Sequence, residues 1–456
     1  MPSRIAVIGS GYVGTVVAAC FAHLGHAVTG VEIDSEKLSL LRQGKAPFHE
    51  AGLDDLLSAG TSSGGLCFTD NVSLAMERCE LVFICVGTPT GHDGHPDMSA
   101  TAAVAKKIAP NLKGYHVVVV KSTVPIGTGR WLRTLIEDHL PAGYGPDHFS
   151  IVSNPEFLRE GNAVQDFLYP DRVVLGGDRP QALDLVAEAY RPVLDGDFPK
   201  GPHRPGSVPV IFTSTTTAEA IKYASNSFLA SKISFVNELA KICELVGADV
   251  TEVTAAMGLD MRIGGQFLDA GLGWGGSCFG KDLRALIAIA TRYGYDARIL
   301  RSALAVNVDQ RKVVVEKLLQ HLKVVSGARI GVLGLAFKAG TDDLRDSPAV
   351  GVCEALLDHK AVVTAYDPMV PTGAGPDGVL RACDAIAVAE RADAVVVATE
   401  WPQFLSIDLS ALRSRMRGRL LLDARNLFQP EKVQAAGLEY VGIGRSQPGE
   451  RVLQSA

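Results

Sequence analysis

A glycine-rich turn near the start of the chain constrains the fold more than any other sequence feature. The turn Gly9-Ser10-Gly11-Tyr12-Val13-Gly14 follows an apolar run at residues 5–8 and precedes a helical pattern, and the next apolar run ends near Glu32. Such glycines let a pyrophosphate approach the helix N-terminus, and the acid can accept both ribose hydroxyls. The pattern predicts a dinucleotide site; the alternative is an ordinary glycine-rich turn. Because a carboxylate at Glu32 would repel a 2′-phosphate, we expect NAD rather than NADP.

Short apolar runs that alternate with helical stretches predict the rest of the fold. In the N-terminal part they lie at residues 27–33, 81–86, 116–121, 150–153 and 172–175. A second series lies at residues 329–333, 361–366, 394–398 and 420–423. This alternation is typical of parallel sheets whose two faces are covered by helices. We therefore expect an α/β protein with two Rossmann-like, doubly wound domains.

A long helical run at residues 215–246 separates the two series. A helix of about thirty residues is roughly 45 Å long. It cannot bury its apolar surface inside one small domain, so we expect it to bridge domains or subunits. The expected division is a dinucleotide domain at 1–198, a linker at 198–209, a central helical domain at 210–302, a second Rossmann-like domain at 325–445 and a flexible tail at 446–456.

Composition argues against several classes of protein. The chain has 456 residues, of which 47% are apolar and 21% charged, as in a soluble multidomain protein. Its net charge of −6 offers no basic field, so nucleic acid is not an expected partner. The N-terminus shows neither a long apolar stretch nor a cleavage site, which favours a cytoplasmic protein without a membrane partner. The eight cysteines form no C-x-x-C pair and the eleven histidines have no ligand spacing, so we expect reduced thiols and no metal site.

A cysteine in a second glycine-rich loop is the candidate nucleophile. The loop Gly275-Gly276-Ser277-Cys278-Phe279-Gly280-Lys281-Asp282 precedes an apolar helical run at 283–290. At a helix start, free backbone amides and the helix dipole lower the pKa of a thiol and stabilise an oxyanion beside it. Asp282, four residues after Cys278, would share its face and could hold a water or a basic partner. The alternative is a hinge with a buried structural thiol and a surface carboxylate.

Two further patterns supply candidate acid–base and oxyanion groups. Lys222 and Asn226 are four residues apart on the long helix, where a lysine can hold an oxyanion or relay a proton and an asparagine can donate to the same oxygen. At residues 154–160 a strand ends with Glu156 and Glu160, and Glu156 could act as the base for water attack on an acyl group. The alternatives are a solvated helix face and exposed capping acids.

Seven motifs in this order resemble those of one family, the UDP-glucose/GDP-mannose dehydrogenases. The resemblance covers nearly the whole chain. The motifs are Gly9-Ser10-Gly11-Tyr12-Val13-Gly14, Val86-Gly87-Thr88-Pro89-Thr90, Lys121-Ser122-Thr123-Val124-Pro125, Asn154-Pro155-Glu156-Phe157-Leu158-Arg159-Glu160-Gly161, Lys222-Tyr223-Ala224-Ser225-Asn226, Gly275-Gly276-Ser277-Cys278-Phe279 and Ala336-Phe337-Lys338.

The resemblance implies a four-electron oxidation. NAD would accept two successive hydrides from C6 of a nucleotide-diphosphate hexose, UDP-glucose or a close relative such as dTDP-glucose. Cys278 would hold the aldehyde as a thiohemiacetal and then the acyl group as a thioester, which water cleaves to the uronate. The central domain would carry catalytic residues and the interface of a homodimer, and the C-terminal domain would hold the substrate nucleotide.

The resemblance also implies roles for single residues. Lys222 and Asn226 would stabilise the C6 oxyanion, and Asp282 would orient the lysine and a water. Thr123 and Glu156 would position the hydrolytic water, and Arg262 would reach in from the neighbouring subunit. Expected cofactor contacts are Gly9, Gly11, Tyr12, Val13, Gly14, Glu32, Lys37, Thr88, Pro89, Thr123, Glu160 and Arg345. Expected substrate contacts are Glu156, Phe157, Leu158, Arg159, Glu160, Lys222, Asn226, Arg262, Phe267, Leu268, Gly275, Phe337, Lys338 and Arg425.

Two residues depart from the family pattern. Glu32 stands where the family more often has aspartate, and Trp274 stands where a smaller aromatic usually lies beside the expected sugar pocket.

The sequence leaves alternative substrates and functions. GDP-mannose and UDP-N-acetylhexosamine are alternative substrates, because a few contacts decide among nucleotides and sugars. A two-electron hydroxyacid or polyol dehydrogenase, which has no use for Cys278, and a non-catalytic nucleotide-sugar sensor are the rival functions.

Overall fold

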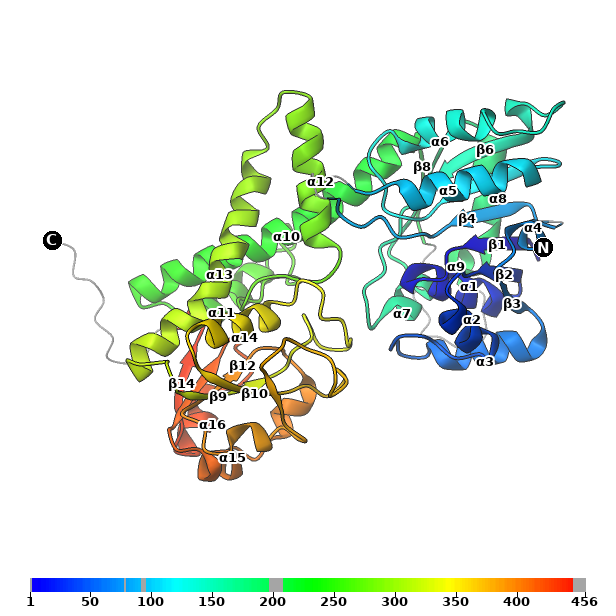
Figure 1. The fold of residues 1–456 in the computed structure, drawn as a ribbon. Helices are drawn as coiled ribbons and strands as arrows, with labels where there is room; N and C mark the ends of the chain where they lie inside the picture. The colour runs from blue at the N-terminus through cyan, green and yellow to red at the C-terminus, as the bar shows by residue number, and fades with distance from the viewer. Residues whose placement is uncertain (1, 78, 92–95, 197–207, 446–456) are drawn as a thin grey trace. The chain divides into compact units, whose positions relative to one another are not determined.

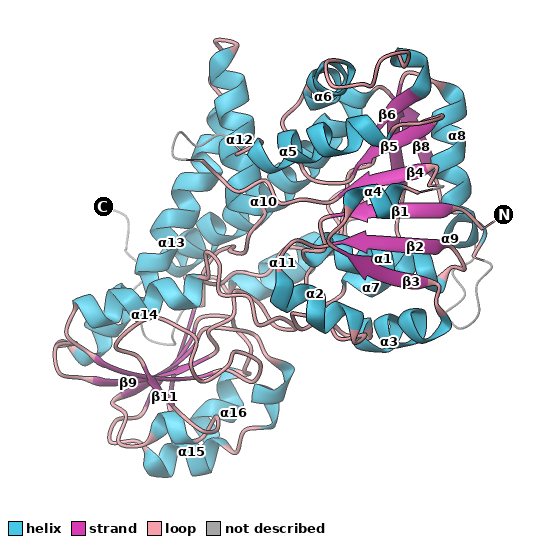
Figure 2. Cartoon of the chain, turned by 45° about the vertical axis from the view of Figure 1, so that its right-hand side comes forward, coloured by secondary structure: helices cyan, strands magenta, loops and turns pink. Residues whose placement is uncertain are grey.

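The computed structural model describes residues 2–77, 79–91, 96–196 and 208–445 (Figure 1). The chain divides into two compact units, residues 1–225 and residues 226–456, called unit 1 and unit 2 below. Each unit contains one sheet with helices packed on it (Figure 2). Most of the expected linker at 198–209 and the whole expected tail at 446–456 lie outside the described residues.

Unit 1 is built on an eight-stranded sheet of order β3-β2-β1-β4-β5-β6-β7-β8. All neighbouring strands are parallel except β6 and β7, which are antiparallel, with Ser153 opposite Gly176. The strands are β1 (Arg4–Ile8), β2 (Ala27–Val31), β3 (Leu66–Thr69), β4 (Leu81–Ile84), β5 (His116–Val120), β6 (Phe149–Ser153), β7 (Val173–Gly177) and β8 (Val210–Thr213). The expectation of a purely parallel sheet is wrong at β7, because an apolar run predicts a strand but carries no information about its direction.

Helices cover both faces of this sheet. Alternate residues of β1 point to opposite faces, so Ile5 and Val7 belong to one core and Ala6 and Ile8 to the other. Full burial of each valine or isoleucine contributes about 1.5–3 kcal/mol. The helices are α1 (Tyr12–His23), α2 (Ser35–Arg42), α3 (Leu53–Ser63), α4 (Val72–Met76), α5 (Ser99–Ile108), α6 (Thr128–Glu137), α7 (Ala163–Leu168), α8 (Pro180–Ala189) and α9 (Arg191–Asp195), with short 3₁₀ turns η1 (Ala109–Asn111) and η2 (Pro146–His148).

The long helix α10 (Thr215–Val246) has 32 residues and begins and ends where the sequence predicts. Its start is capped by Ser214, whose hydroxyl accepts the amide of Thr217 at 3.2 Å. At 1.5 Å per residue the helix is roughly 48 Å long. The division between the two units falls within it, after Ser225.

Unit 2 contains a six-stranded, fully parallel sheet of order β11-β10-β9-β12-β13-β14. This order equals that of the first six strands of unit 1, and both are the doubly wound Rossmann order. The strands are β9 (Arg329–Leu333), β10 (Val362–Tyr366), β11 (Leu380–Arg381), β12 (Ala394–Val397), β13 (Leu420–Asp423) and β14 (Glu439–Gly442). The helices are α11 (Val250–Gly258), α12 (Phe279–Arg292), α13 (Arg298–Leu322), α14 (Pro348–Asp358), α15 (Leu409–Arg415) and α16 (Pro430–Ala435), with 3₁₀ turns η3 (Ala387–Ala389) and η4 (Pro402–Ser406).

The predicted fold class, two Rossmann-like sheets with a long helix between them in the sequence, is confirmed. The carboxyl ends of parallel strands meet at one edge of a sheet, where such folds bind ligands. In unit 1 this edge carries the residues that follow β1, β4, β5 and β6. In unit 2 it carries those that follow β9, β10, β12 and β13.

Candidate active site

The glycine turn of unit 1 is shaped for a phosphate group. Gly9 has φ +95°, and its amide donates to Val31 at 3.0 Å, which closes the turn between β1 and β2. A Cβ on Gly14 would lie 1.8 Å from the Gly9 carbonyl oxygen, so only glycine allows this close approach. A Cβ on Gly11, the N-cap of α1, would meet no atom within 4 Å. The space above the helix N-terminus is therefore open, and its amides can bind an anion.

Glu32 follows β2 directly and is held in a fixed direction. Its Oε1 accepts the amides of Ile33 at 2.8 Å and Asp34 at 2.9 Å, and the side chain is mostly buried. Asp34 in turn caps α2 by accepting the amides of Glu36 and Lys37. The exposed Lys37 ammonium lies 4.0 Å from the Asp34 carboxylate. The acid is thus placed beside the turn, as ribose recognition requires.

Hydrogen bonds tie together the loops after β4 and β5. The Thr88 hydroxyl donates to the Thr123 carbonyl at 2.7 Å, and the Ser122 hydroxyl donates to the Val86 carbonyl at 2.6 Å. Thr88 is buried, whereas Pro89 is exposed. These bonds bring the expected cofactor residues Thr88 and Thr123 to the same edge of the sheet as the glycine turn.

A second connection joins the turn to the loop after β6. The Tyr12 hydroxyl donates to the Glu50 carboxylate, and the Gly161 amide donates to the same carboxylate at 2.7 Å. Burial, and then the bond to Glu50, raise the pKa of Tyr12 far above its ordinary value. Sequence reasoning missed Glu50, which lies before α3 and outside every motif. Gly161 follows Glu160 directly, so this network fixes the position of Glu160 relative to the turn.

Lys222 and Glu156 form a buried ion pair in unit 1. The Lys222 ammonium lies 2.8 Å from Glu156 Oε1, and the side chains are 5% and 6% exposed. Glu156 Oε2 accepts the Leu158 amide at 2.6 Å, and the Lys222 ammonium lies 5.5 Å from the centre of the Phe157 ring. Burial raises the pKa of Glu156, but the charge and hydrogen bond of Lys222, together with the Leu158 amide and the charge of Lys121, outweigh burial, so the net shift of the pKa is downwards. A solvated helix face and an exposed capping acid, the alternatives for these residues, do not hold.

A second buried lysine, which sequence reasoning missed as a site residue, stands beside this pair. Lys121 follows β5 directly and donates to Asn154 Oδ1 at 3.1 Å. Burial, only partly offset by the charge of Glu156, lowers the pKa of Lys121 to about 8. The signal was available, because a lysine that follows the valine run 117–120 must lie at the carboxyl edge of a buried strand. Three charged side chains, Lys121, Glu156 and Lys222, therefore share this part of the edge.

In unit 2, Cys278 is the N-cap residue of α12 and is partly exposed. Its carbonyl accepts the Asp282 amide at 2.9 Å, which closes the first turn of the helix. Its sulfur lies 3.5 Å from the Ser277 hydroxyl. The structure thus places the thiol at the positive end of a 14-residue helix, as the sequence predicted. Five other cysteines, Cys20, Cys79, Cys85, Cys243 and Cys353, are buried, and none of the eight forms a disulfide.

Asp282 is fully buried and joins two side chains. Its Oδ2 accepts the Asn226 amide group at 2.6 Å, and its Oδ1 lies 2.7 Å from the Lys281 ammonium. The surface-carboxylate alternative therefore does not hold. Because Asn226 uses one amide hydrogen on Asp282, the direction of its side chain is fixed.

The glycines before Cys278 allow a close approach to the loop after β9. A Cβ on Gly275 would lie 2.4 Å from the Asp346 carbonyl oxygen, and one on Gly276 would lie 2.9 Å from the Phe337 ring. Trp274 is a buried anchor of this loop: its indole nitrogen donates to Ser234 at 3.0 Å and its amide donates to Asn307 at 2.8 Å. The large side chain of Trp274 packs beneath the loop.

Some predicted substrate residues of unit 2 lie at the carboxyl edge of its sheet, and one does not. Phe337, Lys338 and Arg425 lie at the carboxyl edge of the sheet, where Arg425 donates to the carbonyls of Ala398 at 2.9 Å and Phe337 at 3.2 Å. The Lys338 ammonium lies 5.8 Å from the centre of the Phe337 ring. The structure does not bring Arg262 to this edge, since its side chain is 89% exposed and paired with Asp260.

Four expected contact residues have other surroundings. Leu268 is buried in the core of unit 2, so only its backbone can face a ligand. Phe267 has φ +63°, an unusual conformation for a phenylalanine, and its ring lies 6.5 Å from that of Phe279. Arg345 and Arg159 form short-range ion pairs with Asp343 and Asp166, respectively.

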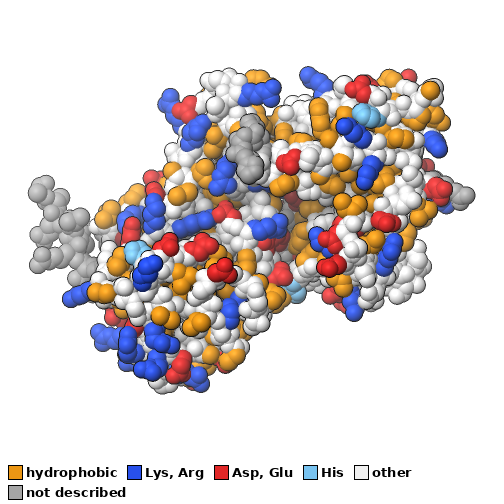
Figure 3. Space-filling model, viewed as in Figure 1, with side chains coloured by type: hydrophobic (Ala, Val, Ile, Leu, Met, Phe, Trp, Pro, Cys, Tyr) orange, Lys and Arg blue, Asp and Glu red, His pale blue; other side chains and the backbone are white. Residues whose placement is uncertain are grey.

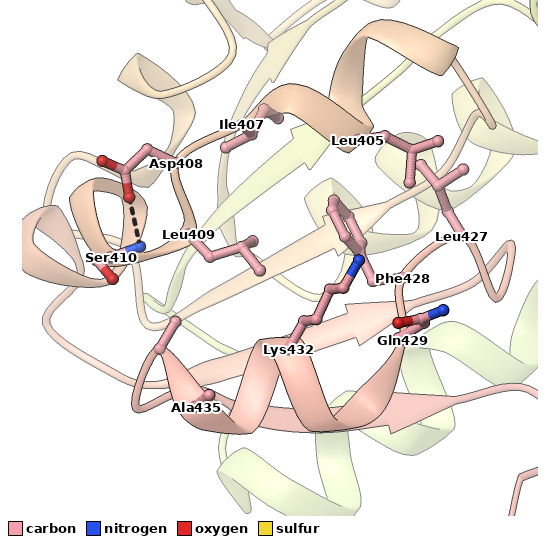
Figure 4. A pocket seen from close by; sticks show the side chains of 11 residues that line it. Leu405, Ile407, Asp408, Leu409, Ser410, Leu427, Phe428, Gln429, Lys432 and Ala435 are labelled. Atoms are coloured by element: carbon pink, nitrogen blue, oxygen red, sulfur yellow. Dashed lines mark hydrogen bonds between the residues drawn. The ribbon is translucent and has the colours of Figure 1, made fainter.

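Other features of the described residues add no site. No group of His, Cys, Asp and Glu side chains among them could hold a metal ion, and no helix of the described part is long and apolar enough to cross a membrane. Acidic and basic side chains are interspersed on the face in Figure 3. A hollow of about 530 Å³ in unit 2 is lined by Leu405, Leu409, Phe428, Lys432 and neighbours, and includes no predicted site residue (Figure 4).

Comparisons with known proteins cover the whole architecture. Family models of the UDP-glucose/GDP-mannose dehydrogenase family match its NAD binding domain at residues 3–194, its central domain at 216–309 and its UDP binding domain at 331–430. The chain is 44% identical to a UDP-glucose 6-dehydrogenase of Rhizobium meliloti over 97% of this chain and 99% of that protein.

Two solved structures share the fold. A UDP-glucose dehydrogenase from Pyrobaculum islandicum has 36% identity and a TM-score of 0.88, and covers 98% of both chains. A UDP-D-ManNAc dehydrogenase from Pyrococcus horikoshii has 30% identity and a TM-score of 0.84, and the match covers 97% of this chain and 99% of that chain.

Proposed function

This chain belongs to the UDP-glucose/GDP-mannose dehydrogenase family, and from this premise we propose that it oxidises C6 of UDP-glucose to the carboxylate with two NAD per sugar. The sugar CH₂OH, two NAD⁺ and one water become a carboxylate, two NADH and three protons. NAD, when bound, supplies the hydride acceptor for both steps. The observation that carries the proposal is the partly exposed Cys278 thiol at the start of α12, which a two-electron dehydrogenase does not need.

The proposed cofactor site is the edge of unit 1 around the glycine turn. The open space above Gly11 and the amides of α1 suit a pyrophosphate, and Glu32 suits the ribose hydroxyls. Glu32 would face a 2′-phosphate with like charge, which favours NAD over NADP. Tyr12, Val13, Lys37, Thr88, Pro89, Thr123, Glu160 and Arg345 complete the proposed cofactor contacts.

Cys278 is the proposed nucleophile. After the first hydride has left C6, the sulfur adds to the aldehyde carbon, a C–S bond forms and the carbonyl oxygen becomes an oxyanion. Loss of the second hydride converts this thiohemiacetal to a thioester. Water then adds to the carbonyl, the C–S bond breaks and the thiolate leaves. The helix N-terminus stabilises negative charge on the sulfur as it leaves.

Lys222, Asn226 and Asp282 are proposed to serve the C6 oxygen. A lysine ammonium and an asparagine amide stabilise an oxyanion by donating hydrogen bonds. Asp282 fixes the Asn226 side chain, and we assign it the orientation of a water as well.

Glu156 and Thr123 are proposed to position the hydrolytic water. The depressed pKa of Glu156 keeps it ionised at neutral pH, so it can accept a proton. Its ion pair with Lys222 holds the carboxylate of Glu156 in a fixed position. Both Glu156 and Thr123 belong to unit 1.

The substrate nucleotide is proposed to bind at the edge of unit 2. Arg425 and Lys338 offer positive charge to a diphosphate, and Phe337 offers an aromatic face to the base. We propose that the chain is organised as an NAD domain at 1–198, a central domain at 210–302 and a nucleotide-sugar domain at 325–445. Eight free cysteines support a proposed cytoplasmic location.

A homodimer is proposed on the exposed face of α10. Phe228, Phe235 and Ile242 follow one another at seven-residue spacing and are 68%, 54% and 49% exposed. Such a stripe of large apolar side chains is typical of a helix that packs against a second helix. A second copy would also explain Arg262, whose exposed guanidinium would enter the partner's site. Sedimentation at micromolar concentration should show a dimer, and Phe235→Asp should give a monomer of low activity; a fully active monomeric wild type would refute this proposal.

The substrate is tested by measuring NADH formation with a panel of UDP-, dTDP- and GDP-hexoses and UDP-N-acetylhexosamines. We expect kcat/KM to be highest for UDP-glucose, since its dehydrogenases include the relative with 44% identity. A higher value for a UDP-N-acetylhexosamine would instead place the chain with the activity of the Pyrococcus horikoshii protein. No turnover of any sugar would exclude the enzyme and favour a sensor.

A further inference from the structure

The sheet of unit 2 repeats the first turn of unit 1. In unit 1, Ile8 is in register with Val31, and the amide of Gly9 donates to the Val31 carbonyl. In unit 2, Leu333 is in register with Tyr366, and the amide of Gly334 donates to the Tyr366 carbonyl at 2.7 Å. Gly9 and Gly334 have φ +95° and +98°. Because Glu32 follows Val31 and Asp367 follows Tyr366, the two acids occupy equivalent positions.

The two equivalent acids point to different partners. Glu32 accepts the amides of the two residues that follow it. Asp367 Oδ2 accepts the amides of Leu335 at 2.7 Å and Ala336 at 3.0 Å, and the indole nitrogen of Trp401 at 3.1 Å. Asp367 Oδ1 accepts the amides of Met369 at 2.9 Å and Val370 at 3.1 Å. The carboxylate is 4% exposed and binds across the turn rather than beside it.

Leu335 and Ala336 follow Gly334 as Ser10 and Gly11 follow Gly9, so their amides lie in the part of the turn that a pyrophosphate approaches in a dinucleotide fold. In unit 2 these amides are already hydrogen-bonded to a carboxylate of the same chain. A phosphate at this position would lose those donors and meet a buried negative charge at close range. The turn is therefore closed to a dinucleotide.

The same contacts fix the loop that leaves the turn. The Ala336 carbonyl accepts the Thr399 hydroxyl at 2.7 Å, and the Leu335 carbonyl accepts the Ser347 hydroxyl at 2.6 Å. With both amides and both carbonyls held, the backbone is fixed up to Phe337, whose carbonyl accepts Arg425. Phe337 and Lys338 are the residues proposed above to bind the substrate nucleotide.

Resting on that proposed function, we propose that Asp367 is a built-in anion that occupies the phosphate turn of the second sheet, excludes a dinucleotide from it and positions the Phe337–Lys338 loop for the substrate nucleotide. It is a positioning residue, because it acts through the loop. Unit 2 thereby keeps the Rossmann order while its turn binds a side chain.

Asp367→Asn tests the proposal, because the asparagine amide group would face N–H donors with its own hydrogens. We expect KM for UDP-glucose and Kd for UDP to rise about tenfold or more, with Kd for NAD within about twofold of wild type. The control is Asp393→Asn, which removes a carboxylate that accepts the Arg329 amide at the opposite end of β9. If Asp367 had only a structural role, both variants would be less stable than wild type, and Asp367→Asn would not raise Kd for UDP more than Kd for NAD. Equal Kd values for UDP in Asp367→Asn and wild type would overturn the proposal.

Amide hydrogen exchange on the wild type decides the matter if Asp367→Asn does not fold. The amides of Leu335 and Ala336 should be protected in the ligand-free protein and unchanged by NAD, whereas those of residues 11–14 should gain protection when NAD binds. Gain of protection at 335–336 on addition of NAD, or fast exchange there without it, would overturn the proposal. Neither Kd for UDP nor amide exchange needs turnover, so a wild type that binds UDP without oxidising UDP-glucose would contradict the proposed function alone.

Discussion

The two sheets of this chain share their strand order but use their ligand edges differently. In unit 1, α1 begins three residues after Gly9, so the helix N-terminus stands directly at the turn. In unit 2, residues 335–347 separate Gly334 from α14, and Asp367 holds the first two amides of that loop. One turn is open above Gly11, and the other is filled by a carboxylate of its own chain. Sheet topology alone therefore does not decide which ligand a Rossmann-like unit binds.

The buried carboxylates at the two edges also differ in their partners. Glu156 in unit 1 is paired with the Lys222 ammonium, and Lys121 adds a second positive charge. Asp423 in unit 2 accepts backbone amides, those of Arg425 at 3.2 Å and Phe428 at 2.7 Å. A carboxylate with a lysine partner can exchange a proton, whereas one held by amides fixes the shape of a loop. Under the proposed function, the proton acceptor Glu156 belongs to unit 1, whereas the nucleophile Cys278 and the nucleotide-binding residues belong to unit 2.

The largest expected effect comes from removing the thiol of unit 2. Cys278→Ser keeps nearly the same shape but removes the good nucleophile and leaving group, so complete oxidation should slow by roughly a thousandfold or more. The first hydride transfer should partly survive, because it needs the oxyanion groups rather than the sulfur. Stopped-flow NADH absorbance with limiting UDP-glucose measures both steps. The control Cys383→Ser, an exposed thiol of the same unit, should behave as wild type.

Glu156→Gln and Asp423→Asn sharpen the contrast between the two buried carboxylates. Glu156→Gln leaves the Lys222 charge buried without a counter-charge and should lower the free energy of unfolding by about 3–5 kcal/mol. Asp423→Asn keeps one acceptor oxygen for the neutral backbone donors, so it should lower the free energy of unfolding by only about 1 kcal/mol. Urea denaturation at neutral pH, followed by circular dichroism, compares them. Equal losses of unfolding free energy in the two variants would show that the two buried carboxylates do not differ in their contribution to stability.

The same pair should respond to pH in opposite directions. The folded pKa of Glu156 lies below its ordinary value of 4.5, so its contribution to stability is present above that pH and is lost as the pH falls through the folded pKa. Burial raises the folded pKa of Asp423 above its ordinary 3.8, so its contribution is present below that pH and is lost as the pH rises through the folded pKa. The stability deficit of Glu156→Gln relative to wild type should therefore shrink on acidification, and that of Asp423→Asn should not. The midpoints of urea denaturation of the wild type and both variants, measured over a pH series, test both trends.

Gly11→Ala tests whether the first turn is the open one. A Cβ there meets no protein atom within 4 Å, so the fold should not change, but the methyl group narrows the approach of a phosphate to α1. Loss of one charge-assisted hydrogen bond of about 1.5–3 kcal/mol would raise Kd for NAD by roughly 10- to 150-fold. Gly351→Ala in α14, whose Cβ would make ordinary contact with Arg311, is the matched control. An unchanged Kd for NAD in Gly11→Ala would contradict the claim that the turn of unit 1 is open to the cofactor.

Glu32→Gln has the smallest expected effect. It removes the charge that a 2′-phosphate would meet but keeps an acceptor for ribose, so the kcat/KM ratio of NADP to NAD should rise about tenfold. Glu36→Gln, at an exposed position at the start of α2, should leave that ratio unchanged. Parity of the two cofactors in the wild type would already contradict the assigned role of Glu32.

Much of this architecture could be predicted from the sequence, because apolar runs and long helical patterns are local signals. The strands β1, β4, β5 and β9 and the ends of α10 agree with the expected ranges to within two residues. The four strands at the edges of the two sheets, β3, β8, β11 and β14, were missed, since none of them forms a long apolar run. The reversed direction of β7 was also missed, because pairing between distant segments decides it.

The candidate site was predicted less completely, for a related reason. Motifs mark Lys222, Glu156, Cys278 and Asp282, and the structure adds their partners. Lys121 could have been recognised from its place after a valine run, but Glu50 and Asp367 could not. Their importance depends on backbone amides that the fold brings to them from residues 161 and 335–336.

The number of NADH molecules released per molecule of UDP-glucose tests the central claim most directly. With limiting sugar and excess NAD, the wild-type protein should release two NADH and form one uronate, since one cofactor site and one thiol serve both oxidation steps. Absorbance at the NADH maximum, together with chromatography of the sugar product, gives both quantities in one experiment. Release of one NADH with accumulation of the free aldehyde would contradict the covalent, four-electron account and return Cys278 to a structural role.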